Sequence, residues 1–244
     1  MKIVDYYSLE RETIAISCSL FDRFVAKTSP TQSRDFQLIA LTTLYMAVKL
    51  NDRKTSSTLK SFVRLGRNQF SDIEIEQMEM NILFTLEWLV NPPTPQAFIS
   101  HFFEVPSIMI LNQSQKRVFL ELAVYIIEIM ILQAQFIPER NSTIALTSVV
   151  LAMSVIDTNH VSYEEQMTSF KSLLSLTKTS LKDISLLCDR FKTVLKDTSI
   201  DLNEVSRVLD PENVLYQYED SETEYHRISY VSPQSMNARP VTPS

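Results

Sequence analysis

The side chains that most often carry out chemistry are sparse in this sequence of 244 residues. Its three histidines, His101, His160 and His226, have no spacing that is typical of a metal site. The two cysteines, Cys18 and Cys188, lie far apart, as buried thiols in a reducing compartment would. Motifs for a nucleophile, a phosphate-binding loop or a kinase are also missing. We therefore expect no catalytic residues, no metal or cofactor, and no small-molecule substrate.

Three charged residues stand where the surrounding pattern predicts apolar side chains. Asp22 adjoins the apolar pair Leu20-Phe21, so its carboxylate should be partly buried and in need of a partner. Lys49 falls near the expected end of a helix, where the helix dipole favours a cation. Glu79 interrupts an apolar stripe that runs from Ile75 to Leu86. Each charge could be satisfied locally, or Lys49 and Glu79 could form a polar pair at the rim of an apolar groove for a partner helix.

The elements that hold these charges are predicted to be helices. A single glycine, Gly66, argues against folds that depend on glycine turns. Apolar residues recur at spacings of three and four, and Ser71-Asp72-Ile73-Glu74 has the form of a capping box. The pattern predicts helices at residues 10–27, 32–51, 59–65, 71–88, 96–103, 113–136, 142–157, 163–176 and 180–196, with one helical turn at 205–209.

The central helices of the two halves can be aligned as an internal repeat. Ile39-Ala40-Leu41-Thr42 matches Ile144-Ala145-Leu146-Thr147, and Ala47 matches Ala152 at the same offset. Small residues at these positions allow neighbouring helices to approach closely, as the centre of a bundle requires. The proline-rich segment 91–95 should break any helix and link the two units.

Composition sets the expected domain limits at 1–91, 92–197 and 198–244. The last segment holds eight acids against three arginines and few apolar residues, so we expect a disordered acidic tail. Within it, Ser232-Pro233 and Thr242-Pro243 have the form of proline-directed phosphorylation sites, although such dipeptides also occur in tails by chance.

Charge and hydropathy argue against two kinds of partner. Residues 1–197 hold 21 acids and 20 bases, without the basic face that binds DNA or RNA. The apolar stretches are too short to cross a membrane or are interrupted by Glu121 and Glu128. We therefore expect a protein as the partner.

Several blocks of sequence together resemble the cyclin box. They are, in order, Glu12-Thr13, Leu20-Phe21-Asp22-Arg23-Phe24, Gln37-Leu38, Ala47-Val48-Lys49, Met78-Glu79, Ile82-Leu83, and Pro93-Thr94-Pro95 with Phe98. Their order and spacing are similar to the family's across about residues 5–105, whereas the second half resembles its C-terminal fold only by helix pattern and the repeat. The resemblance implies an all-α protein of two tandem five-helix bundles. It also implies that the partner is a cyclin-dependent Ser/Thr kinase of the cell cycle, in the nucleus and cytoplasm.

The resemblance further implies roles for single residues. Lys49 and Glu79 match the lysine and glutamate that bind main chain around the kinase's mobile C helix, and Leu38 and Ala47 match positions that pack the central helix. Ser154, opposite Lys49 in the second copy, is uncharged, so kinase contact should belong to the first copy. Binding of the kinase helix in its inward position would activate the kinase by population shift.

Two features depart from the family's pattern. Met1 falls inside the first helix of the box, so we expect the first bundle to lack most of that helix and its substrate-docking patch. The same segment supplies the arginine that pairs with Asp22, which is therefore expected to lack its usual partner. Shortly after Lys49, the family frequently has two acidic residues, whereas this chain has Asn51-Asp52. We expect this difference to alter the choice of kinase.

Two alternatives use the same pattern differently. A transcription-factor-type cyclin fold would need a basic face and a salt-dependent affinity for DNA, which this charge distribution does not predict. A passive scaffold would bind a protein without activating it. An unrecognised helical enzyme has no site to support it.

Overall fold

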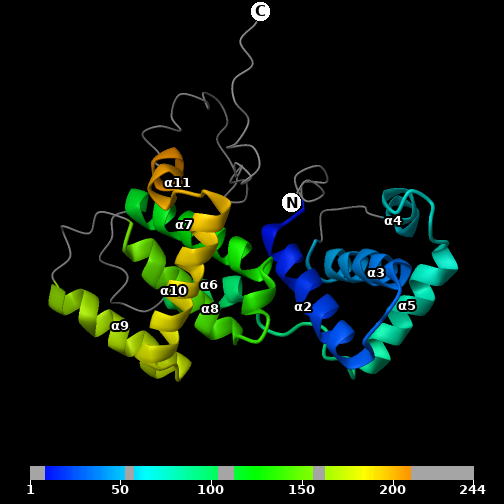
Figure 1. The fold of residues 1–244 in the computed structure, drawn as a ribbon, viewed down its shortest axis with the longest axis horizontal. Helices are drawn as coiled ribbons and strands as arrows, with labels where there is room; N and C mark the ends of the chain where they lie inside the picture. The colour runs from blue at the N-terminus through cyan, green and yellow to red at the C-terminus, as the bar shows by residue number, and fades with distance from the viewer. Residues whose placement is uncertain (1–8, 53–57, 104–112, 156–162, 210–244) are drawn as a thin grey trace, which may run out of the picture.

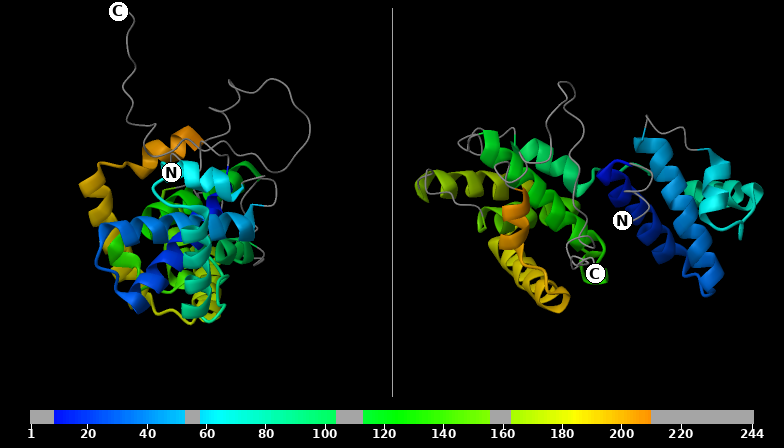
Figure 2. Two further views of the ribbon diagram at one scale, coloured as in Figure 1. Left: turned by 90° about the vertical axis from the view of Figure 1, so that its right-hand side faces the viewer. Right: turned by 90° about the horizontal axis from the view of Figure 1, so that it is seen from above.

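The computed structural model describes residues 9–52, 58–103, 113–155 and 163–209. Within these ranges the protein is all-helical, with ten α-helices, one short 3₁₀ helix and no strand, as the sequence predicts (Figure 1). Two bundles lie side by side in Figure 1 and in the right-hand view of Figure 2. The first holds α2 (Arg11–Thr28), α3 (Ser33–Asn51), α4 (Leu59–Leu65) and α5 (Asp72–Thr85). The second holds α6 (Pro95–Phe103), α7 (Gln113–Ile131), η2 (Ala134–Phe136), α8 (Asn141–Met153), α9 (Tyr163–Thr177), α10 (Leu181–Thr198) and α11 (Leu202–Leu209).

In the first bundle, α3 is the helix against which α2, α4 and α5 pack. Leu38, Ile39 and Ala47 are buried on it, so the small side chain of Ala47 lies where the helices approach. Ala40, in contrast, is exposed. The sequence expectation that Ala40 lies where neighbouring helices approach is therefore wrong for the described residues, because α2, α4 and α5 leave this side of α3 open.

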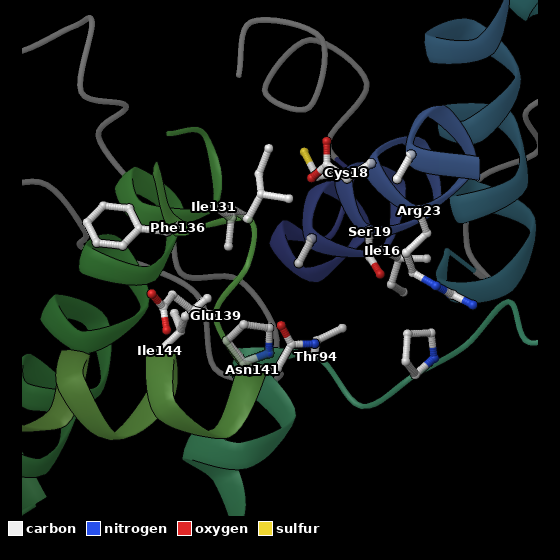
Figure 3. A pocket seen from close by; sticks show the side chains of 16 residues that line it. Ile16, Cys18, Ser19, Arg23, Thr94, Ile131, Phe136, Glu139, Asn141 and Ile144 are labelled. Atoms are coloured by element: carbon white, nitrogen blue, oxygen red, sulfur yellow. The ribbon is translucent and has the colours of Figure 1, made fainter. Parts of the chain in front are cut away.

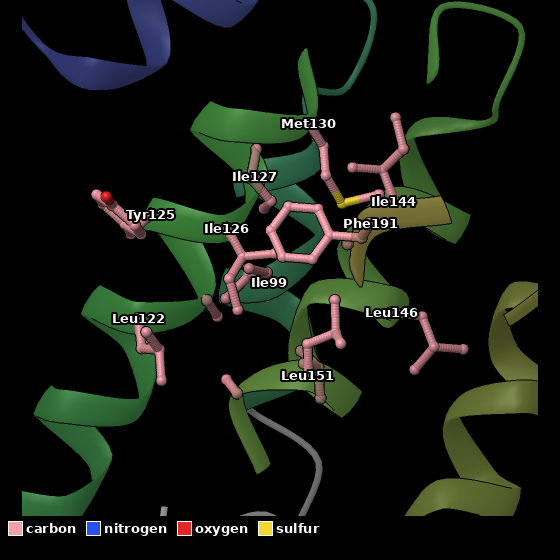
Figure 4. Packing of buried hydrophobic residues seen from close by; sticks show 14 of the residues in the cluster. Ile99, Leu122, Tyr125, Ile126, Ile127, Met130, Ile144, Leu146, Leu151 and Phe191 are labelled. Carbon is pink, nitrogen blue, oxygen red and sulfur yellow. The ribbon is translucent and has the colours of Figure 1, made fainter. Parts of the chain in front are cut away.

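In the second bundle, α8 occupies the corresponding central place. Its apolar residues join the largest core of the protein, in which Ile99, Ile126 and Phe191 meet from three other helices (Figure 4). The hydroxyls of Thr147 and Ser148 are buried, but each donates to a carbonyl of its own helix, at 2.8 and 2.7 Å. A polar group can be buried at little cost when it is hydrogen-bonded in this way.

Three helix ends differ from the sequence expectation, and one of them is the end of α8, which stops at Met153 instead of residue 157. The capping box at Ser71 is present, with the Ser71 hydroxyl and the Glu74 carboxylate each accepting from the other residue's backbone. The helix that it starts ends at Thr85 rather than near Trp88, because the next residues turn into the left-handed region. Helix α7 ends at Ile131, and residues 134–136 form a separate 3₁₀ turn.

The one glycine serves close packing rather than a positive φ. Gly66 follows α4 with φ of −73°, and a β-carbon built on it would lie 2.8 Å from Cδ2 of Leu41. Ser29 and Ser199, at the ends of α2 and α10, instead have φ of 47° and 55°. Glycine is the residue that helix ends of this kind prefer, so both serines carry backbone strain.

The packed part of the chain continues past residue 197. The single turn expected at 205–209 is a two-turn helix, α11, which buries Leu202 and Val205 against the second bundle. The sequence composition placed the end of the second domain at residue 197, before α11, because only these few apolar residues mark this helix. The rest of the acidic tail, with Ser232 and Thr242, lies outside the described residues.

Polar side chains join the two bundles where α2 faces the second bundle. Arg11 donates to the buried carboxylate of Glu128 on α7, at 3.2 Å. The Thr94 hydroxyl donates to Glu12 and accepts from the backbone N–H of Ala97 at 3.1 Å, which caps α6. Two of the sequence blocks, Glu12-Thr13 and Pro93-Thr94-Pro95, therefore meet at the junction. None of the described helices combines the length and apolar character needed to span a membrane.

Candidate partner-binding site

The structure brings Lys49 and Glu79 into direct contact. Lys49 lies in the last turn of α3 and Glu79 in the middle of α5, and Nζ of Lys49 forms an ion pair with Oε1 of Glu79. The side chains are 45% and 16% exposed, so the pair lies at the edge of the bundle with the ammonium facing solvent. Thirty positions separate the two residues, and the packing of α3 against α5 joins them.

An aromatic side chain holds the lysine in place. Nζ of Lys49 lies 4.7 Å from the ring centroid of Tyr45, one helical turn earlier on α3. The Tyr45 ring in turn packs edge-on against Phe62 of α4, with 5.1 Å between the centroids. Attraction between a cation and a ring face restrains the ammonium while leaving its other donors free. Nothing in the sequence pattern marked Tyr45 for this role.

The pair can offer hydrogen bonds of both kinds to a neighbouring chain. A lysine ammonium has three donors and a carboxylate several acceptor sites, and the ion pair uses only part of them. The exposed apolar side chain of Leu50 directly follows Lys49 in sequence. This arrangement suits main-chain groups of a partner more than it suits a reaction.

A second feature lies just beyond α5 and was missed by sequence reasoning. Trp88 is 59% exposed, its φ is 62°, and its ring packs edge-on against exposed Phe84 at 6.0 Å. A bulky residue in the left-handed region costs about 1–2 kcal/mol. An exposed tryptophan held at such a cost is typical of a binding surface.

Asp22 is half-buried, as expected, and lies away from the pair. Among the described residues, none forms an ion pair or hydrogen bond with its carboxylate, and burial raises its pKa above the usual value. One turn earlier, burial and the charge of Asp22 raise the pKa of the Cys18 thiol to about 11. The thiol is therefore protonated and unreactive near neutral pH.

Asp22 and Cys18 line a hollow of about 360 Å³ between the bundles. Figure 3 shows Cys18 and Ser19 of α2 on one side, and Phe136, Glu139 and Ile144 of the second bundle on the other. Neither Lys49 nor Glu79 borders it. The apolar groove that the sequence analysis considered beside the pair is therefore not this hollow.

Asp52 has an internal role that the sequence did not indicate. Its carboxylate is buried and accepts from the backbone N–H of Glu10 at 3.1 Å and from the Thr13 hydroxyl at 2.7 Å. Asn51 donates to the same hydroxyl at 3.0 Å. These bonds tie the start of α2 to the end of α3, so in this structure Asp52 is engaged inside the bundle.

The second bundle does not repeat the charged pair. Ser154, at the position that corresponds to Lys49, ends α8 and donates its hydroxyl to the carbonyl of Leu151 at 2.7 Å. In the parts of the chain that the structure describes, no three His, Cys, Asp or Glu residues gather as a metal site would require.

Comparison with known protein families identifies two domains in the chain. Residues 1–91 match the model of the cyclin N-terminal domain, and residues 93–233 match that of the cyclin C-terminal domain. The Lys49–Glu79 pair thus lies in the segment that matches the N-terminal domain.

Curated relatives match parts of the chain. The G1/S-specific cyclin CCN1 of Candida albicans is 35% identical over 89 residues, which are 36% of this chain and 13% of that protein. The G1/S-specific cyclin-E1 of Gallus gallus is 27% identical over 128 residues, 50% of this chain and 31% of that protein. The chain thus aligns with less than a third of either relative.

One solved structure is similar at low identity. A chain of the CAK complex from Chaetomium thermophilum, bound to ATP-gamma-S, aligns with a TM-score of 0.45 and 17% identity, over 91% of this chain and 78% of that one. The family assignment instead depends on the two domain matches, which cover most of the sequence. By these matches the chain belongs to the cyclins, a family of non-catalytic kinase regulators.

Proposed function

We propose that this protein is the regulatory subunit of a cyclin-dependent Ser/Thr protein kinase, which it binds and activates in cell-cycle control in the nucleus and cytoplasm. The observation that supports this most is the ion pair of Lys49 and Glu79, which stands at an exposed edge of the domain that matches the cyclin N-terminal model. The relatives that match are named as G1/S-specific cyclins, which is consistent with the proposal.

Binding depends on the pair and on the apolar surface beside it. Lys49 donates to a main-chain carbonyl of the kinase and Glu79 accepts from a main-chain N–H, around the kinase's mobile C helix. Leu50, which directly follows Lys49 in sequence, supplies apolar contact area next to these bonds. Such interfaces gain most of their affinity from a few anchoring residues, and exposed aromatic rings are frequent among them.

Activation follows as a shift of population between two kinase conformations. The cyclin binds the C helix in its inward position, which places the helix glutamate on the catalytic lysine. Moving a kinase from mostly inactive to mostly active needs about 5 kcal/mol of differential binding. Fixed side chains such as Lys49, restrained by Tyr45 and Glu79, lose little entropy on binding and so favour the selected conformation.

An activation assay tests the proposal. The full chain, tagged and expressed with a cyclin-dependent kinase of the same organism, should co-purify with it, and the eluate should phosphorylate a Ser/Thr peptide at least tenfold faster than the kinase alone. A tagged chain with Lys49→Ala and Glu79→Ala should lose both the kinase and the activity.

Three results would speak for the alternatives. Co-purification without added activity indicates a passive scaffold. Salt-sensitive retention of a DNA duplex in a gel-shift assay indicates a transcription-factor-type protein. Kinase binding that survives the double substitution unchanged means that the site lies elsewhere.

A further inference from the structure

Helix α5 leaves a whole face without a partner. It packs against α2, α3 and α4 through residues such as Ile75 and Ile82, which are buried. On the opposite face, Ile73, Met80 and Phe84 are 64%, 44% and 65% exposed. Their spacings of seven and four place them on one line along the helix. We refer to these three residues as the outer face of α5, which lies at the edge of the first bundle farthest from the second (Figure 1).

This face points away from the pair proposed to bind the kinase. Each residue of an α-helix turns the side-chain direction by about 100°, so the three residues lie roughly 100–140° around α5 from Glu79. A partner seated on Lys49 and Glu79 would cover Leu83 and neighbouring positions before it reached this line. The outer face would therefore remain open in the kinase complex.

The charged residues of α5 itself and of the turn that follows it are all acidic. Residues 71–91 hold five Asp or Glu and no Lys or Arg. Three of the five pair with cations from other helices, namely Glu74 with Arg34, Glu79 with Lys49 and Glu87 with Lys27. Glu76, which lies one turn before Met80 and three residues after Ile73, is exposed and has no ion pair among the described residues.

We propose that the outer face of α5 docks an amphipathic helix of a second protein, other than the kinase, with Lys or Arg beside its apolar residues. The three apolar side chains extend over about 16 Å, which three turns of a straight helix would cover. Cations on that helix would meet Glu76 and neighbouring acids. A second copy of this chain would bind less well, because the acidic residues of its own α5 would lie against those of the first copy.

A site-specific cross-link tests the proposal in the full chain. Phe84→benzoylphenylalanine keeps an aromatic ring at an exposed position, and irradiation in the producing cells should join it to one helix of a protein that is not the kinase. A synthetic peptide of that helix should bind the purified chain. Phe84→Lys with Met80→Lys should weaken peptide binding at least tenfold, and Glu76→Lys should weaken it and reduce its salt dependence.

Controls separate this surface from the kinase site and from general stickiness. Leu186→Lys, at an exposed leucine of α10, should leave peptide binding unchanged, and kinase co-purification should be the same for Phe84→Lys as for the natural chain. Cross-links only to the kinase, only to a second copy, to many unrelated proteins or to none would overturn the proposal. So would peptide binding that Phe84→Lys does not weaken. These results leave the kinase proposal untouched.

Discussion

Asp22 carries a negative charge in surroundings that favour its neutral form. Burial raises its pKa in the folded protein above the unfolded value near 3.8. Folding is therefore favoured below the raised pKa, and this advantage is lost as the pH rises through it. At pH 7 the ionised carboxylate costs stability.

Asp22→Asn should accordingly raise the midpoint of thermal unfolding at pH 7, by about 1–4 °C. The gain should shrink as the pH falls below the usual pKa of an aspartate, where the natural side chain is protonated too. Scanning calorimetry at several pH values measures this difference. Asp197→Asn, at an exposed position, is the control. A lower midpoint at pH 7 would mean that the carboxylate has a cationic partner in the folded chain.

Asp52 is a buried carboxylate that, unlike Asp22, has hydrogen-bond donors among the described residues. It accepts two hydrogen bonds at the start of α2 while being buried. Asp52→Ala should lower the free energy of unfolding by about 1–3 kcal/mol, since it leaves both donors unsatisfied. Urea denaturation followed by circular dichroism gives the value. Asp189→Ala, which removes only an exposed pair with Lys192, should change it by less than about 0.5 kcal/mol.

Among the helices, two ends store strain that glycine would release. Ser29 and Ser199 have positive φ at the ends of α2 and α10. Ser29→Gly and Ser199→Gly should each stabilise the protein by about 0.5–1 kcal/mol, because glycine adopts this conformation without a steric penalty. Thermal unfolding checks the gain. Ser154→Gly, where φ is −73°, should give none, and an equal gain there would contradict the explanation.

The sequence predicts a helix or a helix end only where a signal lies within a few residues of it, such as a capping box, an apolar periodicity, or a Gly or Pro. The Ser71 capping box and the matched blocks around Ala47 and Ala152 were readable because periodicity and cap chemistry act over a few residues. The end of α5 was placed too late because no Gly or Pro marks the turn; Trp88 takes up the left-handed conformation instead. Without a local signal, the surrounding fold decides where a helix stops.

For the chain as a whole, the coupling of the two bundles depends on contacts that no local pattern shows. Arg11 and Glu128 are 117 positions apart, and nothing near either residue in sequence indicates the other. The pattern alone offered the pairing of Lys49 with Glu79 as one of two interpretations, and only the resemblance to a family favoured it. Tyr45, Trp88 and Asp52 carried no such signal, because their roles depend on which helices pack together.

Arg11→Met should therefore weaken the junction of the bundles. It removes a cation from a carboxylate that is almost completely buried, which costs about 3–5 kcal/mol. Adding Glu128→Met should recover most of the loss, because the buried negative charge is then gone. Urea unfolding monitored in both bundles measures this. If Arg11→Met costs less than about 0.5 kcal/mol, the ion pair does not hold the bundles together.

The most direct measurement is the affinity of the purified chain for a purified cyclin-dependent kinase, with and without the substitutions Lys49→Ala and Glu79→Ala. The surface pair contributes little to folding, so helicity and the unfolding midpoint should stay nearly unchanged. Removing charged hydrogen bonds from an interface costs about 2–5 kcal/mol, so we expect binding at least 30-fold weaker in titration calorimetry. Asp189→Ala with Lys192→Ala, a matched exposed pair on α10, should bind as the natural chain does. An affinity within twofold of the natural chain's for the Lys49 and Glu79 variant would contradict kinase binding at this pair.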